Sequence, residues 1–413
     1  MNRFLTLIIA IILSIGTLNS FAQRNCGTTN YQLYQISENP LLEQKIKKQE
    51  VEIQNWIKNA KASETEVVYI PIIFHVLYNS TTTNISDAQI LSQMEILNID
   101  YSRKNLDAIN TPAMFATLAA DARIQFCLAH QTPNGNWTDG ITRTSTTKTT
   151  FNMPSNEAKY NSKGGVDAWD TDKYLNIWIV PEIIDGAIMG VLGYAQMPGG
   201  NSATDGIVIG YKFIGNIGTV SAPFNKGRTL THEMGHYFNL YHIWGDDFGS
   251  CSGSDFVDDT PNQASKNFGC PTHPHISCSN NGDMFQNYMD YTNDTCMNLF
   301  TKGQRDRMLA ALNTQRGDLL TSGVCHANYL KKDNDLEFNI FPNPANKQIN
   351  IKINNTESIN IQIIDISGRE IFFKEFETNK ISINTSELTN GIYFLKIKSN
   401  TQIGFKKFII QQQ

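Results

Sequence analysis

The sequence predicts an α+β catalytic unit followed by a small all-β sandwich. Between residues 66 and 325, runs of β-branched and aromatic residues are mixed with a few long segments of helical spacing, as in α+β domains. After a polar stretch at 328–336, apolar residues alternate with a period of two, as in half-buried strands. A chain of 413 residues is long enough for two or three such units.

The first 22 residues have the features of an export signal. Arg3 gives a positive start, residues 4–13 are mostly apolar, and Ser-Phe-Ala at 20–22 forms a small-x-small cleavage site. The apolar run is too short to span a bilayer comfortably, and no later stretch is long and apolar enough. We therefore expect an exported protein without a transmembrane helix in its mature form. A buried first helix or a membrane anchor is the alternative.

Each part of the catalytic unit has its own pattern. A charged helix is expected at 41–62, inside a polar N-terminal segment that we interpret as separate from the core. The β-branched run at 67–77 predicts a buried strand, and the spacing at 85–99 predicts a helix capped by Ser86 or Asp87. The other expected elements are strands at 124–129, 175–180 and 206–211, a helix from about Thr229, and a last helix at 301–320.

The net charge of −5 and the pI near 5.9 argue against nucleic acid or anionic lipid as a main partner. Seven cysteines in an exported chain point to disulfides with one thiol left over. Four of the seven lie between residues 251 and 296, a loop-rich stretch that two bridges would stabilise. A second zinc site is the alternative, although the chain contains no Cys-x-x-Cys pair.

A short histidine motif in the middle of the chain is the strongest functional signal. His232 and His236 are four residues apart, so a helix presents both on one face, where they can bind one metal ion. Glu233 lies beside the first ligand and can deprotonate a metal-bound water. His242 adds a third nitrogen if the chain turns near Asn239, a residue type that tolerates left-handed backbone. Three ligands with an open fourth position indicate catalytic zinc.

The spacing His-Glu-x-x-His-x-x-Asn-x-x-His resembles that of the metzincins, in which glycine is usual where this chain has Asn239. Met289, in Asn-Tyr-Met-Asp-Tyr, is the candidate for the methionine-bearing turn of that group; ordinary core packing is the alternative. With Gly-Tyr-Ala-Gln at 193–196 and Asp-Thr-Pro at 259–261, these strings resemble the pappalysin family of metzincin endopeptidases, its ulilysin-like members in particular.

The resemblance implies a metzincin-like domain, with a twisted mixed sheet and a loop-rich lower part, that hydrolyses protein or peptide substrates. The zinc ligands that it implies are His232, His236 and His242. It makes Glu233 the general base and then the acid, places Met289 beneath the metal, and directs the Tyr291 hydroxyl to the tetrahedral intermediate. Asp294 would form the floor of the pocket just past the scissile bond and favour arginine there; a solvated aspartate is the alternative.

Further site features follow from the same resemblance. The disulfides that it implies are Cys251–Cys278 and Cys270–Cys296. A third bridge, Cys127–Cys325, would follow by elimination. Cys26 resembles a cysteine switch, whose thiolate takes the open zinc position and keeps the enzyme latent; a free or dimer-forming thiol is the alternative.

A structural calcium site is also expected, because an acidic loop offers hard oxygen ligands where the family often binds this ion. The candidate ligands are Asp255, Asp258, Asp259 and Thr260, with Asp247 as a weaker addition.

The C-terminal domain resembles the sorting modules of the type IX secretion pathway. The similar strings are Phe-Pro-Asn-Pro-Ala at 341–345, Ile-Ser-Gly at 366–368 and Gly-Ile-Tyr-Phe at 391–394. This implies passage from the periplasm across the outer membrane to the surface or the medium, with the type IX machinery as a partner. An adhesive sandwich is the alternative.

The predicted organisation is therefore a signal peptide at 1–22, a propeptide with the cysteine switch at 23–64, a catalytic domain at 65–327, a linker at 328–338 and a sorting domain at 339–413. Two other functions compete with a zymogenic zinc endopeptidase. One is a non-catalytic, zinc-stabilised surface protein, which would need the histidines but not Glu233. The other is a zincin of another clan, with a downstream glutamate in place of His242.

Overall fold

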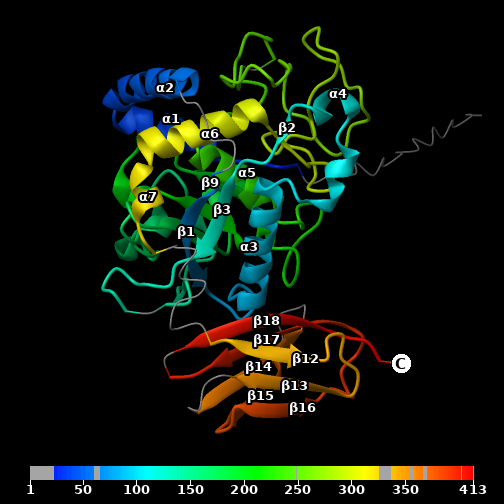
Figure 1. Ribbon diagram of the computed structural model, residues 1–413. Coiled ribbons are helices and arrows are strands. Elements are labelled where there is room, and N and C mark those ends of the chain that lie inside the picture. The colour runs from blue at the N-terminus through cyan, green and yellow to red at the C-terminus, as the bar shows by residue number, and fades with distance from the viewer. Residues whose placement is uncertain are drawn as a thin grey trace, which may run out of the picture.

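The computed structural model describes residues 23–59, 66–136, 138–247, 249–324, 336–353, 358–365, 370–400 and 402–412. The export signal expected at 1–22, Cys325, and most of the expected linker, at 328–335, lie outside these ranges. Figure 1 shows a helix-containing unit and a separate all-strand unit, and this agrees with the predicted fold class.

A six-stranded mixed sheet forms the centre of the catalytic unit, in the order β3-β1-β6-β10-β9, with β4 also pairing with β1. Its strands are β1 (Val68–Tyr78), β3 (Ile124–Leu128), β4 (Ile141–Ser145), β6 (Leu175–Val180), β9 (Gly193–Ala195) and β10 (Ile207–Gly210). Strand β6 is buried along its whole length, as its continuous apolar sequence predicts for a central parallel strand. The edge strand β9 runs antiparallel to β10.

The helices of the catalytic unit are α3 (Asp87–Tyr101), α4 (Ala113–Ala116), α5 (Arg228–Tyr237), α6 (Lys302–Gln315) and α7 (Gly317–Thr321). Helix α3 begins as expected, since the Ser86 hydroxyl accepts a hydrogen bond from the Gln89 amide. Helix α5 packs against β9, β10 and α3. Shorter strands are β2 (Ala119–Ala120), β5 (Phe151–Asn152), β7 (Ile183–Asp185), β8 (Ile188–Val191) and β11 (Phe300–Thr301). Turns of 3-10 helix lie at Leu106–Asn110, Glu157–Lys159, Asn161–Lys163, Ser202–Thr204 and Tyr211–Phe213.

The last helix is not continuous over 301–320, as the sequence pattern predicted. It breaks at Arg316, whose φ of −137° lies outside the helical range. The Arg316 guanidinium donates to the Asp205 carboxylate and to the carbonyl groups of Gln196 and Tyr237. The helix thus breaks at a residue whose side chain is bound by buried partners distant in the sequence.

The N-terminal segment is helical and packs into the catalytic unit, so its interpretation as separate from the core was wrong. It forms α1 (Thr28–Glu38), which the sequence analysis missed, and α2 (Leu41–Asn59). Figure 1 shows α2 lying along α6. Ile53 of α2 is fully buried against Ala310 and Ala311, and Tyr31 of α1 is 1% exposed. These helices bury isolated apolar side chains among many charged ones, so average composition did not reveal the contact.

The C-terminal unit is a β-sandwich of two antiparallel sheets, β12-β13-β16 and β15-β14-β17-β18. Its strands are β12 (Phe338–Phe341), β13 (Gln348–Ile353), β14 (Ile359–Asp365), β15 (Glu370–Phe376), β16 (Lys380–Asn384), β17 (Gly391–Lys398) and β18 (Ile403–Ile410). Leu336 and Phe338 are buried in its core, so the sandwich includes residues that the sequence analysis assigned to the linker. Within the described parts of the chain, no helix has both the length and the apolar character needed to cross a bilayer.

Candidate active site

Three histidine side chains converge beside α5. The Nε2 atoms of His232 and His236 are 3.2 Å apart, and those of His236 and His242 are 3.1 Å apart. Each side chain is at most 1% exposed. A tetrahedral zinc ion bound at about 2.0–2.1 Å separates its nitrogen ligands by roughly 3.3–3.4 Å, so the three rings fit zinc.

The turn after α5 brings His242 to the other two rings. Asn239 has a left-handed φ of 72°, and the chain reverses there. Arg307 of α6 holds this residue, because its Nε donates to the Asn239 carbonyl at 2.8 Å and its Nη2 to the Asn239 side-chain oxygen at 2.6 Å. A glycine adopts this backbone conformation without strain. The chain instead uses an asparagine whose side chain is bound by a buried guanidinium.

The outer nitrogen of each ring has a fixed partner. The Nδ1 atoms of His232 and His236 lie 2.7 Å from the carbonyl oxygens of Tyr288 and Leu240. A carbonyl can only accept, so each Nδ1 donates and each Nε2 keeps its lone pair for a metal. The Nδ1 of His242 lies 2.9 Å from both carboxylate oxygens of Asp246.

Burial keeps the rings of His232 and His236 neutral. It lowers the pKa of His232 well below the usual range, and the neighbouring imidazoles act in the same direction. Burial, and then His242, lowers the pKa of His236 to about 3. Neutral imidazole is the form that binds a metal, so the environment favours ligation over protonation.

Cys26 of the N-terminal segment completes a group of four metal-binding side chains. Its sulfur and one nitrogen from each of His232, His236 and His242 all lie within 4.8 Å of one another. The Sγ donates to Glu233 Oε2 at 3.3 Å. Thiolate and imidazole are both ligands that zinc binds in proteins. Cys26 therefore lies within reach of a metal ion held by the three histidines.

Glu233 is enclosed by the same segment and by the edge strand. Its Oε2 accepts a hydrogen bond at 2.9 Å from the Thr28 hydroxyl, which itself accepts one from the Ala195 amide at 2.9 Å. Gly193 lies so close that an added Cβ would be 3.1 Å from the Glu233 Cγ. Burial raises the pKa of Glu233 to about 7. A carboxylate with such a pKa suits proton transfer near neutral pH.

A methionine turn lies beneath the histidines. Met289 is fully buried, and its sulfur contacts α5 at Gly235, where a Cβ would clash with it. Asn287 fixes the turn through two hydrogen bonds with Gln304 of α6, at 2.8 and 3.0 Å. The carbonyl of Tyr288, in the same turn, accepts the bond from His232. The turn thus supports both the helix and one ring of the cluster.

Tyr291 follows this turn, and its ring lies beside His232 and His242. Its hydroxyl donates to the Cys26 carbonyl oxygen at 3.4 Å, and its ring stands edge-on to His242 and Trp244. Burial, and then Cys26, raises the pKa of Tyr291 well above its ordinary value. The hydroxyl therefore stays protonated and can donate a hydrogen bond.

The geometry agrees with similarity to known proteins. The peptidase M43 family model, described as pregnancy-associated plasma protein-A, matches residues 158–313. An extracellular metalloprotease of Arthroderma benhamiae is 32% identical over 256 residues, which cover 60% of this chain and 79% of that protein. This chain belongs to the M43 peptidases, the pappalysin family.

Two solved structures of Tannerella forsythia proteins are similar to this pappalysin. Mature mirolysin with a cleaved peptide is 49% identical, with a TM-score of 0.60, and the match covers 65% of this chain and 100% of the solved one. A promirolysin mutant is 46% identical, with a TM-score of 0.65, and the match covers 75% and 100%. The chain is thus a secreted zinc metalloprotease homologous to the promirolysin zymogen. Its residues 339–411 match the secretion system C-terminal sorting domain.

Asp294 is paired with an arginine of the same chain. Asp294 is fully buried, and its Oδ1 accepts a 2.5 Å hydrogen bond from Nη2 of Arg24. Arg24 also donates to the Thr229 hydroxyl at 3.1 Å and to the Thr292 carbonyl at 3.3 Å, and it lies over the Phe224 ring. Asp294 and its neighbours in this pappalysin therefore bind the Arg24 guanidinium through hydrogen bonds and charge.

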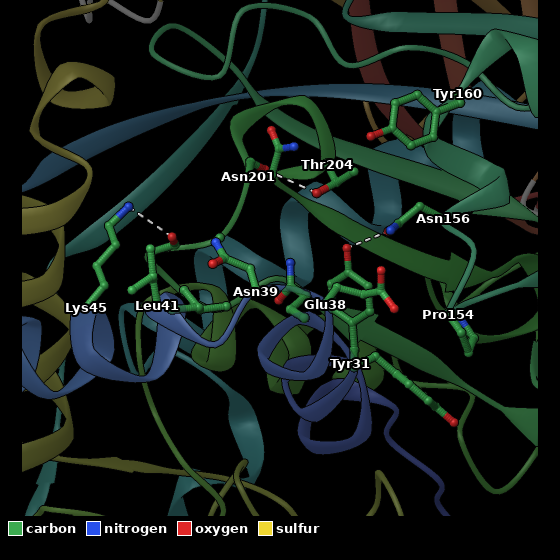
Figure 2. Close-up of a pocket in the computed structure, with 15 residues that line it drawn as sticks. Tyr31, Glu38, Asn39, Leu41, Lys45, Pro154, Asn156, Tyr160, Asn201 and Thr204 are labelled. Carbon is green, nitrogen blue, oxygen red and sulfur yellow. Dashed lines mark hydrogen bonds between the residues drawn. The ribbon is translucent and has the colours of Figure 1, made fainter.

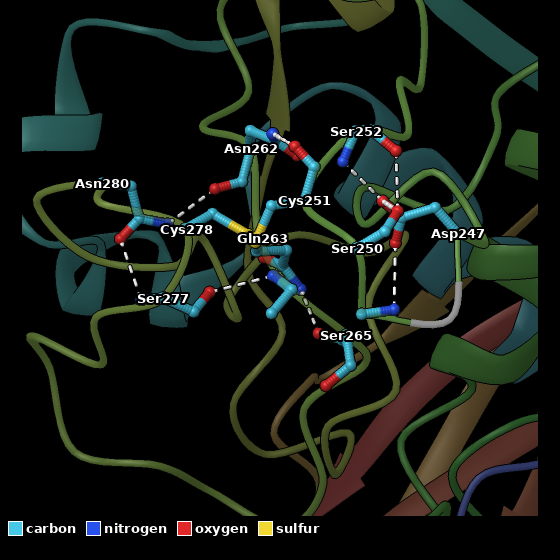
Figure 3. Close-up of a disulfide and its surroundings, with 12 residues drawn as sticks. Asp247, Ser250, Cys251, Ser252, Asn262, Gln263, Ser265, Ser277, Cys278 and Asn280 are labelled. Carbon is cyan, nitrogen blue, oxygen red and sulfur yellow. Dashed lines mark hydrogen bonds between the residues drawn. A yellow bond between two sulfur atoms is a disulfide. The ribbon is translucent and has the colours of Figure 1, made fainter.

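Two disulfides stabilise the loops below the active site. They join Cys251 to Cys278 and Cys270 to Cys296, with Cα atoms 5.5 and 5.8 Å apart. These are the two pairs that the family resemblance implied. Figure 3 shows the first bridge among loop side chains, where Asp247 accepts hydrogen bonds from Ser250 and Ser252. Cys127 is disulfide-bonded, but Cys325 lies outside the described residues, so their pairing stays a prediction.

The acidic loop expected to bind calcium is tied together internally. Asp255 accepts hydrogen bonds from the Thr260 hydroxyl at 2.7 Å and from the Val257 amide at 3.1 Å, whereas Asp258 is exposed. Within the described residues, the histidine cluster with Cys26 is the one group of three or more metal-binding histidine, cysteine or acidic side chains. Calcium binding by this loop stays a prediction.

Three residues with a direct role in this arrangement were missed from the sequence. Arg24 lies two residues before Cys26, and its charge was a usable signal once Asp294 was expected to favour arginine. Thr28 and Arg307 had no such signal. A hydroxyl near a cysteine and a basic residue in a helix are too common to indicate a contact.

Proposed function

We propose that this chain is made as a latent zymogen and, once the prosegment is removed, hydrolyses peptide bonds within proteins on the N-terminal side of arginine. The observation that carries the arginine preference is the insertion of Arg24 into the Asp294 pocket. Arg24 lies two residues from Cys26, whose sulfur is grouped with the histidine nitrogens. A substrate arginine just past the scissile bond would fill the same pocket.

His232, His236 and His242 would hold the zinc, which when bound acidifies a coordinated water and polarises the substrate carbonyl. Glu233 would take the proton from the attacking water and pass it to the leaving amine. Tyr291 would donate its hydroxyl proton in a hydrogen bond to the developing oxyanion. Mature mirolysin has been solved with a cleaved peptide, which supports peptide-bond hydrolysis by this site.

We further propose that residues 1–22 direct export to the periplasm and that the sorting domain engages the type IX machinery for passage across the outer membrane. The match of residues 339–411 to a sorting domain supports the second step. Structural calcium at the 255–260 loop belongs to the same proposal and rests on the acidic residues of that loop, Asp255, Asp258 and Asp259.

The test compares peptides that differ only in the residue after the scissile bond. For the mature enzyme, kcat/KM should be highest with arginine, lower with lysine and lowest with leucine, because a planar guanidinium makes several directed bonds there. Asp294→Ala should lower kcat/KM for the arginine peptide by at least tenfold. The kcat/KM values of the arginine, lysine and leucine peptides should then lie closer together than in the wild type. Glu233→Ala should abolish hydrolysis of all three with zinc still bound. Equal cleavage of the arginine and leucine peptides would refute the preference.

A further inference from the structure

Tyr31 of the prosegment occupies a slot on the opposite side of β9 from the catalytic glutamate. Neighbouring residues of a strand face opposite sides, so Gly193 lies against Glu233 while the ring of Tyr194 points away from it. The Tyr31 ring packs on that of Tyr194, with centroids 4.8 Å apart, and is 1% exposed.

The slot binds the Tyr31 hydroxyl with two side-chain oxygens. The hydroxyl lies 2.5 Å from Asn156 Oδ1, to which it donates, and 3.3 Å from Gln196 Oε1. Figure 2 shows Tyr31 directed at Asn156, with Thr204 nearby, in the wall of an open pocket of about 520 Å³ between the prosegment and the catalytic unit. The inner part of the slot is thus already adjacent to solvent-accessible space.

A buried lysine covers the face of the same ring. Lys159 is fully buried, and its ammonium lies 4.6 Å from the centroid of Tyr31 and 4.9 Å from that of Tyr194. Among the described residues, its hydrogen bonds go to the Thr204 carbonyl and to the Tyr31 hydroxyl. Burial lowers the pKa of Lys159 to about 7. The proposed reaction does not use this lysine.

When the prosegment leaves, every group of the slot except Tyr31 remains with the catalytic unit. We propose that the vacated slot is an exosite of the mature enzyme that binds a tyrosine side chain of a protein substrate. This inference rests on the proposed function, since it requires removal of the prosegment.

A phenol fits the vacated slot better than other side chains. Asn156 would have an acceptor oxygen turned to the slot, and the Lys159 amine would lie over the position that the Tyr31 ring leaves. Phenylalanine would fill the volume but leave the Asn156 oxygen unpaired, whereas Gln196 Oε1 keeps its 2.7 Å hydrogen bond from the Thr204 hydroxyl. A site built for a hydroxyl penalises such an unpaired acceptor strongly. The ammonium favours the electron-rich face of an aromatic ring.

The slot adjoins the catalytic cleft. The Thr28 hydroxyl bridges Glu233 and the Ala195 amide, and Tyr31 follows Thr28 by one turn of α1. One substrate can therefore reach the scissile position and the exosite together, and the second contact then adds affinity without new chemistry.

The test measures binding of N-acetyl-L-tyrosinamide to the mature enzyme by saturation-transfer NMR. It should bind at least about fivefold more tightly than N-acetyl-L-phenylalaninamide, given the net value of a buried hydrogen bond. The full-length zymogen, whose slot is filled, should not bind it. Asn156→Gly keeps the left-handed backbone (φ 54°) but removes the acceptor, and Lys159→Met removes the charge, so both should weaken binding by at least about fivefold. Lys173→Met, at an exposed lysine, is the matched control and should bind as the wild type does.

Equal binding of the two amides, or equal binding to zymogen and mature enzyme, would overturn the exosite, as would unchanged affinity in Asn156→Gly and Lys159→Met. The arginine peptide distinguishes this failure from that of the proposed function. If the mature enzyme cleaves that peptide but does not bind the tyrosine amide, the exosite alone is wrong.

Discussion

At the scale of single residues, the prosegment covers each reactive group with a side chain of matching chemistry. The sulfur of Cys26 lies with the zinc-binding nitrogens, and the Thr28 hydroxyl is bound to Glu233. Arg24 is paired with Asp294. These contacts come from five consecutive residues, so a short stretch of chain covers the histidine cluster, Glu233 and Asp294 together.

Removal of the thiol should release only one of these blocks. In full-length Cys26→Ala, hydrolysis of the arginine peptide should rise at least about tenfold over the wild-type zymogen, because zinc loses its fourth protein ligand. It should stay below that of the mature enzyme, since Thr28 and Arg24 keep their positions. The measurement is the initial rate of hydrolysis of the arginine peptide by the three forms at equal zinc content. Activity of Cys26→Ala no higher than that of the wild-type zymogen would show that Cys26 contributes nothing to latency.

Arg307 should support the third histidine through Asn239. Arg307→Met should lower zinc affinity of the mature enzyme by about tenfold or more, the usual effect of losing a group that orients a ligand. In Asn239→Gly, the left-handed turn no longer needs Arg307 to hold it. Adding Arg307→Met to this variant should therefore lower zinc affinity less than Arg307→Met does in the wild type. Zinc competition with a chelator measures all three variants. If the double mutant lost as much zinc affinity on adding Arg307→Met as the wild type does, the arginine would not act through Asn239.

At the scale of elements, α2 is attached to α6 by an ion pair that also reaches the active-site turn. Glu50 of α2 accepts hydrogen bonds from Nη1 and Nη2 of Arg307 at 2.8 and 2.6 Å, and the arginine has no exposed surface. The same guanidinium holds Asn239. Prosegment docking and the geometry of His242 therefore share one side chain.

This ion pair should make prosegment binding sensitive to acid. Burial alone would raise the pKa of Glu50, but the hydrogen bonds and charge of Arg307 outweigh it and lower the pKa below that of a free glutamate. The pair therefore stabilises the complex fully above about pH 4.3, the ordinary glutamate pKa, and is lost as pH falls through the lower, bound value. A peptide of residues 24–59 should bind the mature enzyme at least about tenfold more tightly than its Glu50→Gln form at pH 7.

That advantage should shrink below about pH 4.3, and the ratio of the two affinities by fluorescence anisotropy cancels the other titrating groups. A ratio that does not change with pH would exclude Glu50 as the acid-sensitive group.

The sequence predicted the elements whose patterns are local and strong. The apolar run of β1, the spacing of α3 with its Ser86 cap, and the histidine helix were expected within a few residues of their observed bounds. The break at Arg316 was not predictable, because it depends on Asp205, over a hundred residues away in the chain. The docking of α1 was missed for the same reason, since its buried Tyr31 is bound by distant residues.

At the scale of the whole molecule, the sorting domain has a core of its own. Its buried residues form a cluster distinct from that of the catalytic unit. Among the described residues, a contact between the two units is the 2.8 Å hydrogen bond from Lys396 of β17 to Asp87 at the start of α3. Period-two patterning predicted this unit well, because the alternation of buried and exposed residues is visible within each strand.

Deletion of residues 339–413 should therefore separate export from catalysis. The truncated protein should stay inside the cell envelope, since it lacks the sorting domain, while the full chain reaches the medium. After purification and maturation, its kcat/KM for the arginine peptide should lie within about twofold of the full-length value, because domains with separate cores fold as units. Immunoblots of cell and medium fractions, with enzyme assays of each, measure both effects. Secretion of the truncated protein at the normal level would contradict the assignment of residues 339–413 as a sorting domain.

A cut between α2 and β1 would not by itself free the catalytic cleft, because the contacts of α1 and α2 are non-covalent. Before the cut the inhibitor and its target are one molecule, and blockade does not depend on protein concentration. After the cut they form a bimolecular complex, whose occupancy falls as the solution becomes more dilute. Release into the large volume outside the cell would then drive activation through mass action alone, and the crowded periplasm would keep even nicked enzyme silent.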